Sequence, residues 1–430
     1  MNQLAFGLAV LACAMLVIMP AVADDYTLGI FGNANMDDTI DEEDIAYVEG
    51  IIEGTNEETE LADANYDGRI DKDDIAQIEL IIQGDEKELT LIDSSGKVVT
   101  VGKPVERIIV EYMDTAEIVQ ILGEADKVVG VTNCITENPK QFPELSKRSF
   151  VGIVMPGDPD YEAIISLNPD IYLTFTSDRA VQQREHLPGI TVLYLGLYYP
   201  ELSNAEGSTF ADGVRKLGYI LDRKAEAEQY IKWRNDLIDT IKSRTDGLLE
   251  DEKPRVLMTS RIQPESLEFR TYPDGDKLSL MCTVAGGKSI AENLPEYTMP
   301  LEYRITVDPE WVIEQDPEFI FVHDARTPYG YDMDDPERMK ETRDIFMNHP
   351  ILAEVAAVKS GNVYVLNGVF RNDASGSILG AVYMSKILHP ELFEDLNPQA
   401  IHQEYLTRFQ GLDYDLDEHG VFVYPPLEVS

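Results

Sequence analysis

The sequence predicts an α/β protein: two Rossmann-like lobes joined by a single long α-helix and preceded by a small all-α module with two calcium-type loops. Three observations lead to this prediction. Short β-type runs alternate with helical stripes from residue 89 onward, a long helical segment interrupts this alternation, and an acidic loop–helix pattern occurs twice before it. Alternating strands and helices favour a largely parallel sheet with helices on both faces.

The acidic pattern is clearest in "DANYDGRIDKDD", which begins at residue 63 and runs directly into the helical stripe "IAQIELII". A twelve-residue loop of this spacing supplies oxygen ligands to Ca²⁺, and glycine at position 6, here Gly68, allows the sharp turn. The same pattern, "NANMDDTIDEED" followed by "IAYVEGII", stands earlier in the chain. The predicted ligands are Asn33, Asn35, Asp37, Thr39, Asp41 and Asp44 in the first loop, and Asp63, Asn65, Asp67, Arg69, Asp71 and Asp74 in the second.

Two such loop–helix repeats resemble the dockerin module of secreted, surface-assembled proteins. The resemblance implies Ca²⁺ binding and a cohesin-like partner. The first loop departs from the pattern, because Asn33 replaces the usual Asp and Asp38 stands where Gly is expected. Asp tolerates a left-handed turn better than most residues, so we expect a weaker site there. The alternative is a disordered acidic linker.

The net charge of −44 over 430 residues, without a basic patch, argues against nucleic acid or an anionic membrane surface as partner. Residues 1–23 are largely apolar and end in "AVA", which predicts a signal peptide cleaved after Ala23. Uncleaved, the segment would be just long enough to anchor the chain in a membrane. We therefore expect a protein secreted across the cytoplasmic membrane, at the cell surface or in a periplasm-equivalent space, soluble or tethered. Cys134 and Cys282 lie far apart and are expected to be unpaired.

The predicted domains are the module at 25–88, a first lobe at 89–208, the interlobe helix at 209–249 and a second lobe at 254–430. Strands are expected at 107–112, 127–132, 149–153, 170–175 and 191–196 in the first lobe, and at 254–260, 318–324 and 362–367 in the second. No proline interrupts the helical stripe between Phe210 and Leu249. A single helix of about 35 residues would span about 50 Å.

An internal repeat relates the two lobes. "DYEAIISLNPDIYLTF", from residue 160, aligns without gaps with "DPEWVIEQDPEFIFVH", from residue 308. Each copy predicts a short helix, a turn containing proline and a buried strand. The lobes are therefore expected to be structural copies that face each other across a cleft.

The segments "EIVQILGEADKVVGVTN", "DYEAIISLNPDIYLTF", "HPILAEVAAVKSGNVYVLNG" and "ILGAVYMSKILHPELF", together with the long helix, resemble one family. It is the periplasmic binding proteins of class III fold that deliver iron–siderophores, haem and cobalamin to ABC importers. The resemblance implies a metal-chelate ligand and a permease dimer as partner. In the family, one exposed Glu per lobe pairs with permease arginines, and the matching positions are Glu162 and Glu310. Alternatively, each is merely an acid favoured by a helix dipole.

Ligands of such sheets bind at the carboxyl ends of the strands. The candidates there are Tyr112, Met113, Asn133, Arg179, Tyr198 and Tyr199 in the first lobe, and Arg261, Tyr303, Arg304, His323, Arg326 and Arg371 in the second. Arginines pair with anionic oxygens, and tyrosines stack on flat rings. The alternative for each arginine is a pair with a neighbouring acid, expected for about half of them. For His323, a strand-end side chain with satisfied hydrogen bonds is favoured over a ligand to a chelated metal.

The leading hypothesis is an extracytoplasmic substrate-binding protein for a siderophore, haem or cobalamin, with the choice among them open. A second hypothesis is a cell-surface assembly or scaffold protein that acts through its dockerin-like module. A chelatase-like enzyme is a third, because the same two-lobed fold occurs in chelatases. The sequence has no supported Ser/His/Asp set, no phosphate-binding loop and no cysteine cluster, so we expect no enzymatic activity.

Overall fold

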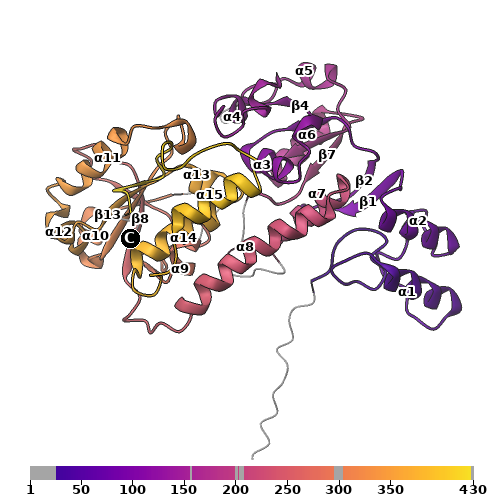
Figure 1. Cartoon of the computed structure of the whole chain (residues 1–430), viewed down its shortest axis with the longest axis horizontal. Coiled ribbons are helices and arrows are strands. Elements are labelled where there is room, and N and C mark those ends of the chain that lie inside the picture. Colours follow the sequence, from indigo (N-terminus) through magenta and orange to yellow (C-terminus); the bar gives the residue numbers. More distant parts are fainter. Residues whose placement is uncertain (1–25, 155–156, 199–201, 203–207, 295–303, 428–430) are drawn as a thin grey trace, which may run out of the picture.

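The computed structural model describes residues 26–154, 157–198, 202, 208–294 and 304–427. It contains a small N-terminal module, two α/β lobes and a helix that runs along both lobes (Figure 1). The predicted signal peptide lies outside the described residues. No described helix is long and apolar enough to cross a bilayer. Cys134 and Cys282 are both free, as expected.

The N-terminal module consists of two loop–helix units, and its helices are α1 (Glu42–Glu53) and α2 (Lys72–Gln83). Asp41 and Asp71 cap these helices, and each forms a capping box with the Asp three residues later. Gly54 and Gly84 end the helices in the left-handed conformation. The two units therefore begin and end on the same signals, as their repeated sequence predicted.

The first lobe is built on a five-stranded parallel sheet of order β5-β4-β3-β6-β7. Its strands are β3 (Ile108–Val110), β4 (Val128–Val131), β5 (Ser149–Phe150), β6 (Ile171–Thr174) and β7 (Thr191–Tyr194). Its helices are α3 (Met113–Ile121), α4 (Asn133–Thr136), α5 (Tyr161–Ser166) and α6 (Ser177–His186). Strand order reverses beside β3, which is where such sheets form a ligand crevice.

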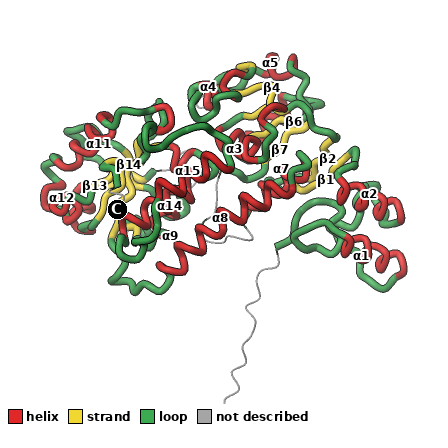
Figure 2. The backbone as a smooth tube through the Cα atoms, viewed as in Figure 1, coloured by secondary structure: helices red, strands yellow, loops and turns green. Residues whose placement is uncertain are grey.

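The second lobe has a seven-stranded mixed sheet of order β11-β9-β8-β12-β13-β14, with β10 beside β8. Its strands are β8 (Arg255–Ser260), β9 (Phe269–Thr271), β10 (Lys288–Ser289), β11 (Ile305–Val307), β12 (Phe319–Asp324), β13 (Val363–Asn367) and β14 (Val423–Tyr424). Its helices are α9 (Lys277–Val284), α10 (Pro309–Gln315), α11 (Glu337–Met347), α12 (Ala356–Ser360), α13 (Val369–Asn372), α14 (Gly376–Leu388) and α15 (Pro398–Arg408). Figure 2 shows the strands of both lobes at the centre, with helices around them.

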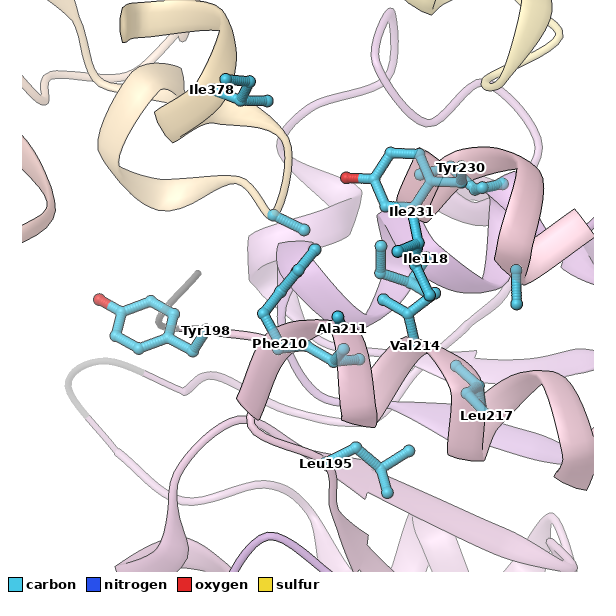
Figure 3. Packing of buried hydrophobic residues seen from close by; sticks show 14 of the residues in the cluster. Ile118, Leu195, Tyr198, Phe210, Ala211, Val214, Leu217, Tyr230, Ile231 and Ile378 are labelled. Carbon is cyan, nitrogen blue, oxygen red and sulfur yellow. The ribbon is translucent and has the colours of Figure 1, made fainter. Parts of the chain in front are cut away.

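The prediction of one helix over 209–249 is wrong. The segment forms α7 (Thr209–Ile220) and α8 (Lys224–Thr245), and Asp222 between them has a φ of 58°, which interrupts the helix. Gly218 lets the two helices approach closely, since a Cβ there would lie 2.8 Å from the Cβ of Ala227. Only the 22-residue α8 runs along both lobes. The predicted apolar stripe is nevertheless buried, and Figure 3 shows its members Phe210, Val214 and Leu217 packed near Tyr230 and Ile231.

The module packs against the first lobe at the α7–α8 joint. A hairpin of β1 (Glu88–Ile92) and β2 (Val98–Gly102) begins at the predicted boundary, but Ile30 of the module pairs with Leu91 of β1. The ammonium group of Lys103 donates to Glu86 of the module at 2.5 Å, to the carbonyl of Tyr219 at 2.8 Å and to Asp222. One hydrophobic core runs from the module into the lobes. The module therefore packs together with the lobes and does not form a separate domain.

Candidate functional site

A cleft of about 520 Å³ lies between the lobes, where loops after the carboxyl ends of the parallel strands converge. Tyr112 and Met113 follow β3, and Phe175 and Thr176 follow β6. On the opposite side, Arg261 follows β8 and Arg326 follows β12. The parallel strands that sequence alternation predicted therefore bring side chains from both lobes to one cavity.

Nine of the twelve predicted contact residues line this cleft, and they are Tyr112, Met113, Asn133, Tyr198, Arg261, Arg304, His323, Arg326 and Arg371. Tyr199 and Tyr303 lie outside the described residues. Arg179 is not among the residues that line the cleft. Its guanidinium pairs with the buried Glu111 at 2.5 Å. Burial by itself would lower the pKa of Arg179, but Glu111 and other neighbouring groups outweigh it and raise the pKa. Glu111 directly follows the neighbouring strand β3, and this long-range pairing is invisible in local sequence.

The wall formed by the first lobe is aromatic. The rings of Tyr112 and Phe175 stack with centroids 4.5 Å apart, and Tyr198 packs edge-on against both at 5.5 Å. Burial raises the pKa of Tyr112, so its hydroxyl is protonated at neutral pH. Such a rigid apolar surface with polar edges suits a flat or aromatic ligand.

The wall formed by the second lobe carries four arginines. Arg371 forms a buried ion pair with Asp276 at 2.6 Å, and Arg326 pairs with the buried Asp324. Arg261 is exposed and has no ion-pair partner among the described residues. The expectation that about half of the arginines would pair with neighbouring acids is therefore confirmed for Arg179, Arg326 and Arg371. The paired arginines are fixed in place, while Arg261 offers its charge to the cleft.

His323 lies among these arginines and is almost completely buried. Its Nδ1 shares a hydrogen bond of 2.9 Å with the hydroxyl of Tyr272, and its Nε2 has no hydrogen-bond partner among the described residues. Burial, together with the charge of Arg371, lowers the pKa of His323 to about 3. The ring is therefore neutral, and only one of its two nitrogens has the hydrogen bond that the favoured interpretation expected.

Sequence reasoning missed several residues that line the cleft. They are Cys134, Glu137, Asn138, Phe175, Thr176, Ser260, Tyr272, Ala325, Thr327, Tyr329 and Asn372. Phe175, Thr176 and Ser260 end or follow strands that were correctly predicted, so their position was a usable signal. Tyr272 directly follows β9, and Tyr329 lies in the loop after β12, where no sequence pattern predicted their position. Burial raises the pKa of Cys134 to about 12, which makes it an unreactive thiol.

Buried polar contacts also join the two lobes. Glu117 of α3 accepts hydrogen bonds from the backbone N–H groups of Ala374 and Ser375 at 2.7 and 2.9 Å, and from the hydroxyl of Tyr405. Gln141 of the first lobe donates to Asp373 at 2.7 Å. These contacts cap the N-terminus of α14 with a carboxylate from the other lobe.

Glu162 and Glu310 are both exposed. Glu162 is the second residue of α5 and Glu310 the second residue of α10, after the matching N-caps Asp160 and Asp308. The internal repeat is therefore reproduced in three dimensions, and the two glutamates occupy equivalent places on the two lobes.

Each of the two calcium-type loops has its own internal hydrogen bonds, and the two loops have a similar pattern. In the second, Asp63 accepts from the N–H groups of Asp67 and Gly68 at 3.0 and 2.8 Å, and Asp74 accepts from that of Asn65 at 3.2 Å. Asp44 and Asn35 repeat the last contact in the first loop at 3.1 Å. Carboxylate, amide and carbonyl oxygens are the donors that Ca²⁺ prefers. Among the described residues, however, no three or more Asp, Glu, His or Cys side chains converge as a metal site.

The two calcium-type loops differ in backbone conformation at position 6. Gly68 has a φ of 89°, whereas Asp38 is not among the residues with positive φ. Position 4 is left-handed in both loops instead, with φ of 66° at Met36 and 56° at Tyr66. A Cβ disfavours the conformation that glycine adopts freely, so the first loop takes a different path at position 6.

A family model described as periplasmic binding protein matches residues 108–369, which is more than half of the chain. This chain belongs to the periplasmic binding protein family. Molybdate-binding protein MolA of Haemophilus influenzae is 20% identical over 348 residues, covering 76% of this chain and 92% of that protein. An uncharacterised ABC transporter substrate-binding lipoprotein, YvrC of Bacillus subtilis, is 23% identical over 229 residues, covering 51% of this chain and 67% of that protein.

Solved periplasmic binding proteins share the fold. FepB of Veillonella parvula, described as TroA-like, superposes with a TM-score of 0.61 at 18% identity, covering 78% of this chain and 98% of that one. CeuE of Helicobacter pylori, in a Ni–His complex, gives 0.57 at 17% identity, covering 77% and 97%. The family is one of solute-binding proteins rather than enzymes, which agrees with the prediction that this chain is not an enzyme.

Proposed function

We propose that this chain is the extracytoplasmic substrate-binding component of an ABC importer and captures an anionic metal chelate. The observation that carries the proposal is the cleft at the strand ends, with arginines on one wall and stacked aromatic rings on the other. Arginine pairs with carboxylate and catecholate oxygens, and aromatic rings pack against flat ligand groups. A ligand with both features matches both walls.

A ferric siderophore is the first choice of ligand. Its anionic oxygens match the arginines, and a cavity of about 520 Å³ is in the range of small-molecule sites. Haem and cobalamin are also metal chelates, and they stay as alternative ligands. Molybdate enters as a second candidate, because MolA is a relative named for binding it and arginines also suit oxyanions. In this chain the aromatic wall favours the chelate over the bare oxyanion.

The N-terminal module is proposed to bind Ca²⁺ in both loops, more weakly in the first. The oxygen donors of each loop and the left-handed Gly68 support this. A cohesin-like surface protein is the proposed partner of the module, and a permease dimer that contacts Glu162 and Glu310 is the proposed partner of the lobes. An assembly protein with a cleft that binds no solute is the alternative function.

Intrinsic fluorescence titration tests the proposed function. The emission of Trp233 on α8 and Trp311 on α10 is measured while ferric siderophores, haemin, cobalamin and molybdate are added in turn with Ca²⁺ present. Saturable quenching by one probe at sub-micromolar concentration is expected. The R261A variant should weaken binding by about ten- to a hundredfold, because a hydrogen bond to a charged group contributes about 1.5–3 kcal/mol.

The matched control is R255A, since Arg255 lies at the opposite end of β8, away from the cleft. It should bind as the unaltered protein does. Equal solute affinity in R261A and R255A would show that the arginine wall is not part of the ligand site. No response to any probe would favour the assembly function.

A further inference from the structure

A group of buried charged side chains joins the two lobes, apart from the arginine wall. Asp114 and Glu117 of α3 belong to the first lobe, whereas Lys277 of α9 and Asp373, which directly follows α13, belong to the second. All four side chains are almost completely removed from solvent. Asp373 is close enough to the other three for their charges to act on it. These four residues are called the interlobe cluster, and it contains three acids and one base.

Two acids of the interlobe cluster have carboxylate oxygens without hydrogen bonds. Neither oxygen of Asp114 has a hydrogen-bond partner among the described residues, and neither does Oδ1 of Asp373. Oδ2 of Asp373 accepts from Gln141 at 2.7 Å, and Glu117 accepts the three hydrogen bonds described above. A buried carboxylate without donors is costly to keep ionised, whereas the protonated form carries no charge. Asp114 and Asp373 are therefore the members that favour a bound proton.

The ionisation of the interlobe cluster falls in the range of neutral pH. Burial raises the pKa of Asp114 to about 7, although the charge of Lys277 opposes this shift. Burial lowers the pKa of Lys277 to about 7, although the charge of Asp114 opposes it. Burial also raises the pKa values of Glu117 and Asp373. Asp114 and Lys277 therefore gain and lose protons as a coupled pair between about pH 6 and pH 8.

The other described groups whose charges act on this pair keep one protonation state in that range. Arg371 and Asp276 form the buried ion pair described above. Burial raises the pKa of each neutral group near Asp114, and these groups are Tyr112, Cys134 and Tyr194. A change in local charge at neutral pH therefore alters the number of protons on the interlobe cluster.

The interlobe cluster borders the cleft. Asp114 and Asp373 each directly follow a residue that lines the cleft. The ammonium nitrogen of Lys277 lies 4.3 Å from the centroid of the Tyr198 ring, and Tyr198 lines the cleft as well. An anion in the cleft therefore places its negative charge near the cluster. A unit charge about 10 Å away in a protein of effective dielectric constant about 20 shifts a pKa by about one unit.

We infer that the interlobe cluster takes up a proton when an anionic solute binds in the cleft, so that solute and proton bind together. The inference rests on the proposed function. The negative charge of the solute repels the ionised carboxyl of Asp114 and attracts the ammonium group of Lys277, so both groups bind a proton more tightly in the complex. The proton comes from solvent, and release of the solute returns it. By linkage, a lower pH strengthens solute binding by the same factor.

The test measures solute affinity and proton uptake of the full chain with Ca²⁺ present. The probe is an anionic ferric tris-catecholate chelate, and molybdate replaces it if the chelate does not bind. Fluorescence titration should show the affinity rising about three- to tenfold from pH 8 to pH 6, because a pKa shift of one unit corresponds to a factor of ten. Calorimetry at pH 7 in HEPES and in Tris, which differ in ionisation enthalpy, should show that binding takes protons from the buffer.

The D114N/K277M variant keeps the approximate size of both side chains and removes both titrating groups. Replacing both members of a buried pair leaves neither charge without its partner, so the fold should persist. Relative to the unaltered protein, most of the rise in affinity between pH 8 and pH 6 should be lost. The readout is this pH dependence, so a uniform change in affinity does not imitate it. Protonation of the probe itself cancels, because all proteins are titrated with the same probe.

The matched control is D212N/K216M. Asp212 and Lys216 form a partly buried ion pair of 2.6 Å on α7, and neither residue lines the cleft. The control should keep the full pH dependence of solute binding.

The outcomes separate the inference from the proposed function. If the unaltered protein binds the probe without taking up protons, or binds it no more tightly at pH 6 than at pH 8, the inference is wrong and the proposed function stands. This comparison needs no variant. An equal pH dependence in D114N/K277M and in the unaltered protein would show that the proton binds elsewhere. If neither probe binds, the proposed function falls and the inference falls with it.

Discussion

His323 and His402 have similar chemical environments in different parts of the second lobe. Both rings are buried, and each shares a hydrogen bond with a tyrosine hydroxyl: His323 with Tyr272 at 2.9 Å, and His402 with Tyr331 at 2.8 Å. Burial is the largest cause that lowers the pKa of each to about 3. Neither ring can take up a proton without a large cost in desolvation.

We therefore expect acid to destabilise the protein between about pH 6.5 and pH 3. The pKa of each histidine is lower in the folded chain than in the unfolded chain, so the unfolded chain binds more protons in this window, and the free energy of unfolding falls as the pH falls. Urea unfolding at pH 7, 5.5 and 4 measures this slope. H402Q should have a shallower slope than the unaltered protein, and an equal slope would show that His402 does not titrate as described.

At the scale of elements, the sequence predicted the strands well and the joint poorly. The strand expected at 170–175 is observed at Ile171–Thr174, because a buried run between turn residues is a local signal. The break between α7 and α8 depends on Asp222, whose left-handed backbone is held beside Lys103, more than a hundred residues earlier. Such a tertiary contact leaves no periodic pattern. The same limit explains why the sequence did not show the pairing of Arg179 with Glu111, although nine other candidates line the cleft.

The N-terminal module shows how a domain boundary drawn from charge can mislead about stability. Lys224 of α8 donates to the carbonyls of Ile81 and Ile82 at the end of α2, at 3.2 and 3.3 Å. The N–H of Ile40, within the first loop, donates to the hydroxyl of Tyr219 at 3.0 Å. Both calcium-type units thus contact the α7–α8 joint directly. Folding of the module and of the first lobe should be one cooperative event.

Removal of Ca²⁺ should therefore lower the melting temperature of the first lobe rather than unfold the module alone. A ligand at a hundred times its Kd stabilises the folded state by about 2.7 kcal/mol. Calorimetry with Ca²⁺ and with a chelator measures the shift. The D63A/D67A variant should lose most of the response, while D126A, on the first lobe outside the loops, should keep it. A separate low-temperature transition, sensitive to Ca²⁺, would instead show an independent module.

For the whole molecule, the important feature is that the lobes are joined by buried polar contacts as well as by α8. Glu117 of the first lobe caps α14 of the second, and the cleft residues Arg371 and Asn372 lie just before the capped turn. Arg371 is also held by Asp276 of its own lobe. The carboxylate of Glu117 therefore helps to hold the segment that carries Arg371 against the first lobe.

E117Q tests this arrangement. The amide oxygen can accept only part of what the carboxylate accepts, and the new NH₂ group faces backbone donors, so we expect a loss of about 1–3 kcal/mol in the free energy of unfolding. Solute affinity should fall as well, because the segment that carries Arg371 loses its anchor. Trp233 stacks on Tyr405, whose hydroxyl bonds to Glu117, so its emission should also change in the absence of solute. Y405F keeps the ring and removes one donor, and it should weaken affinity less than E117Q does. If the E117Q protein were less stable but bound solute with unchanged affinity, Glu117 would only stabilise the fold. The geometry of the cleft would then depend on α8.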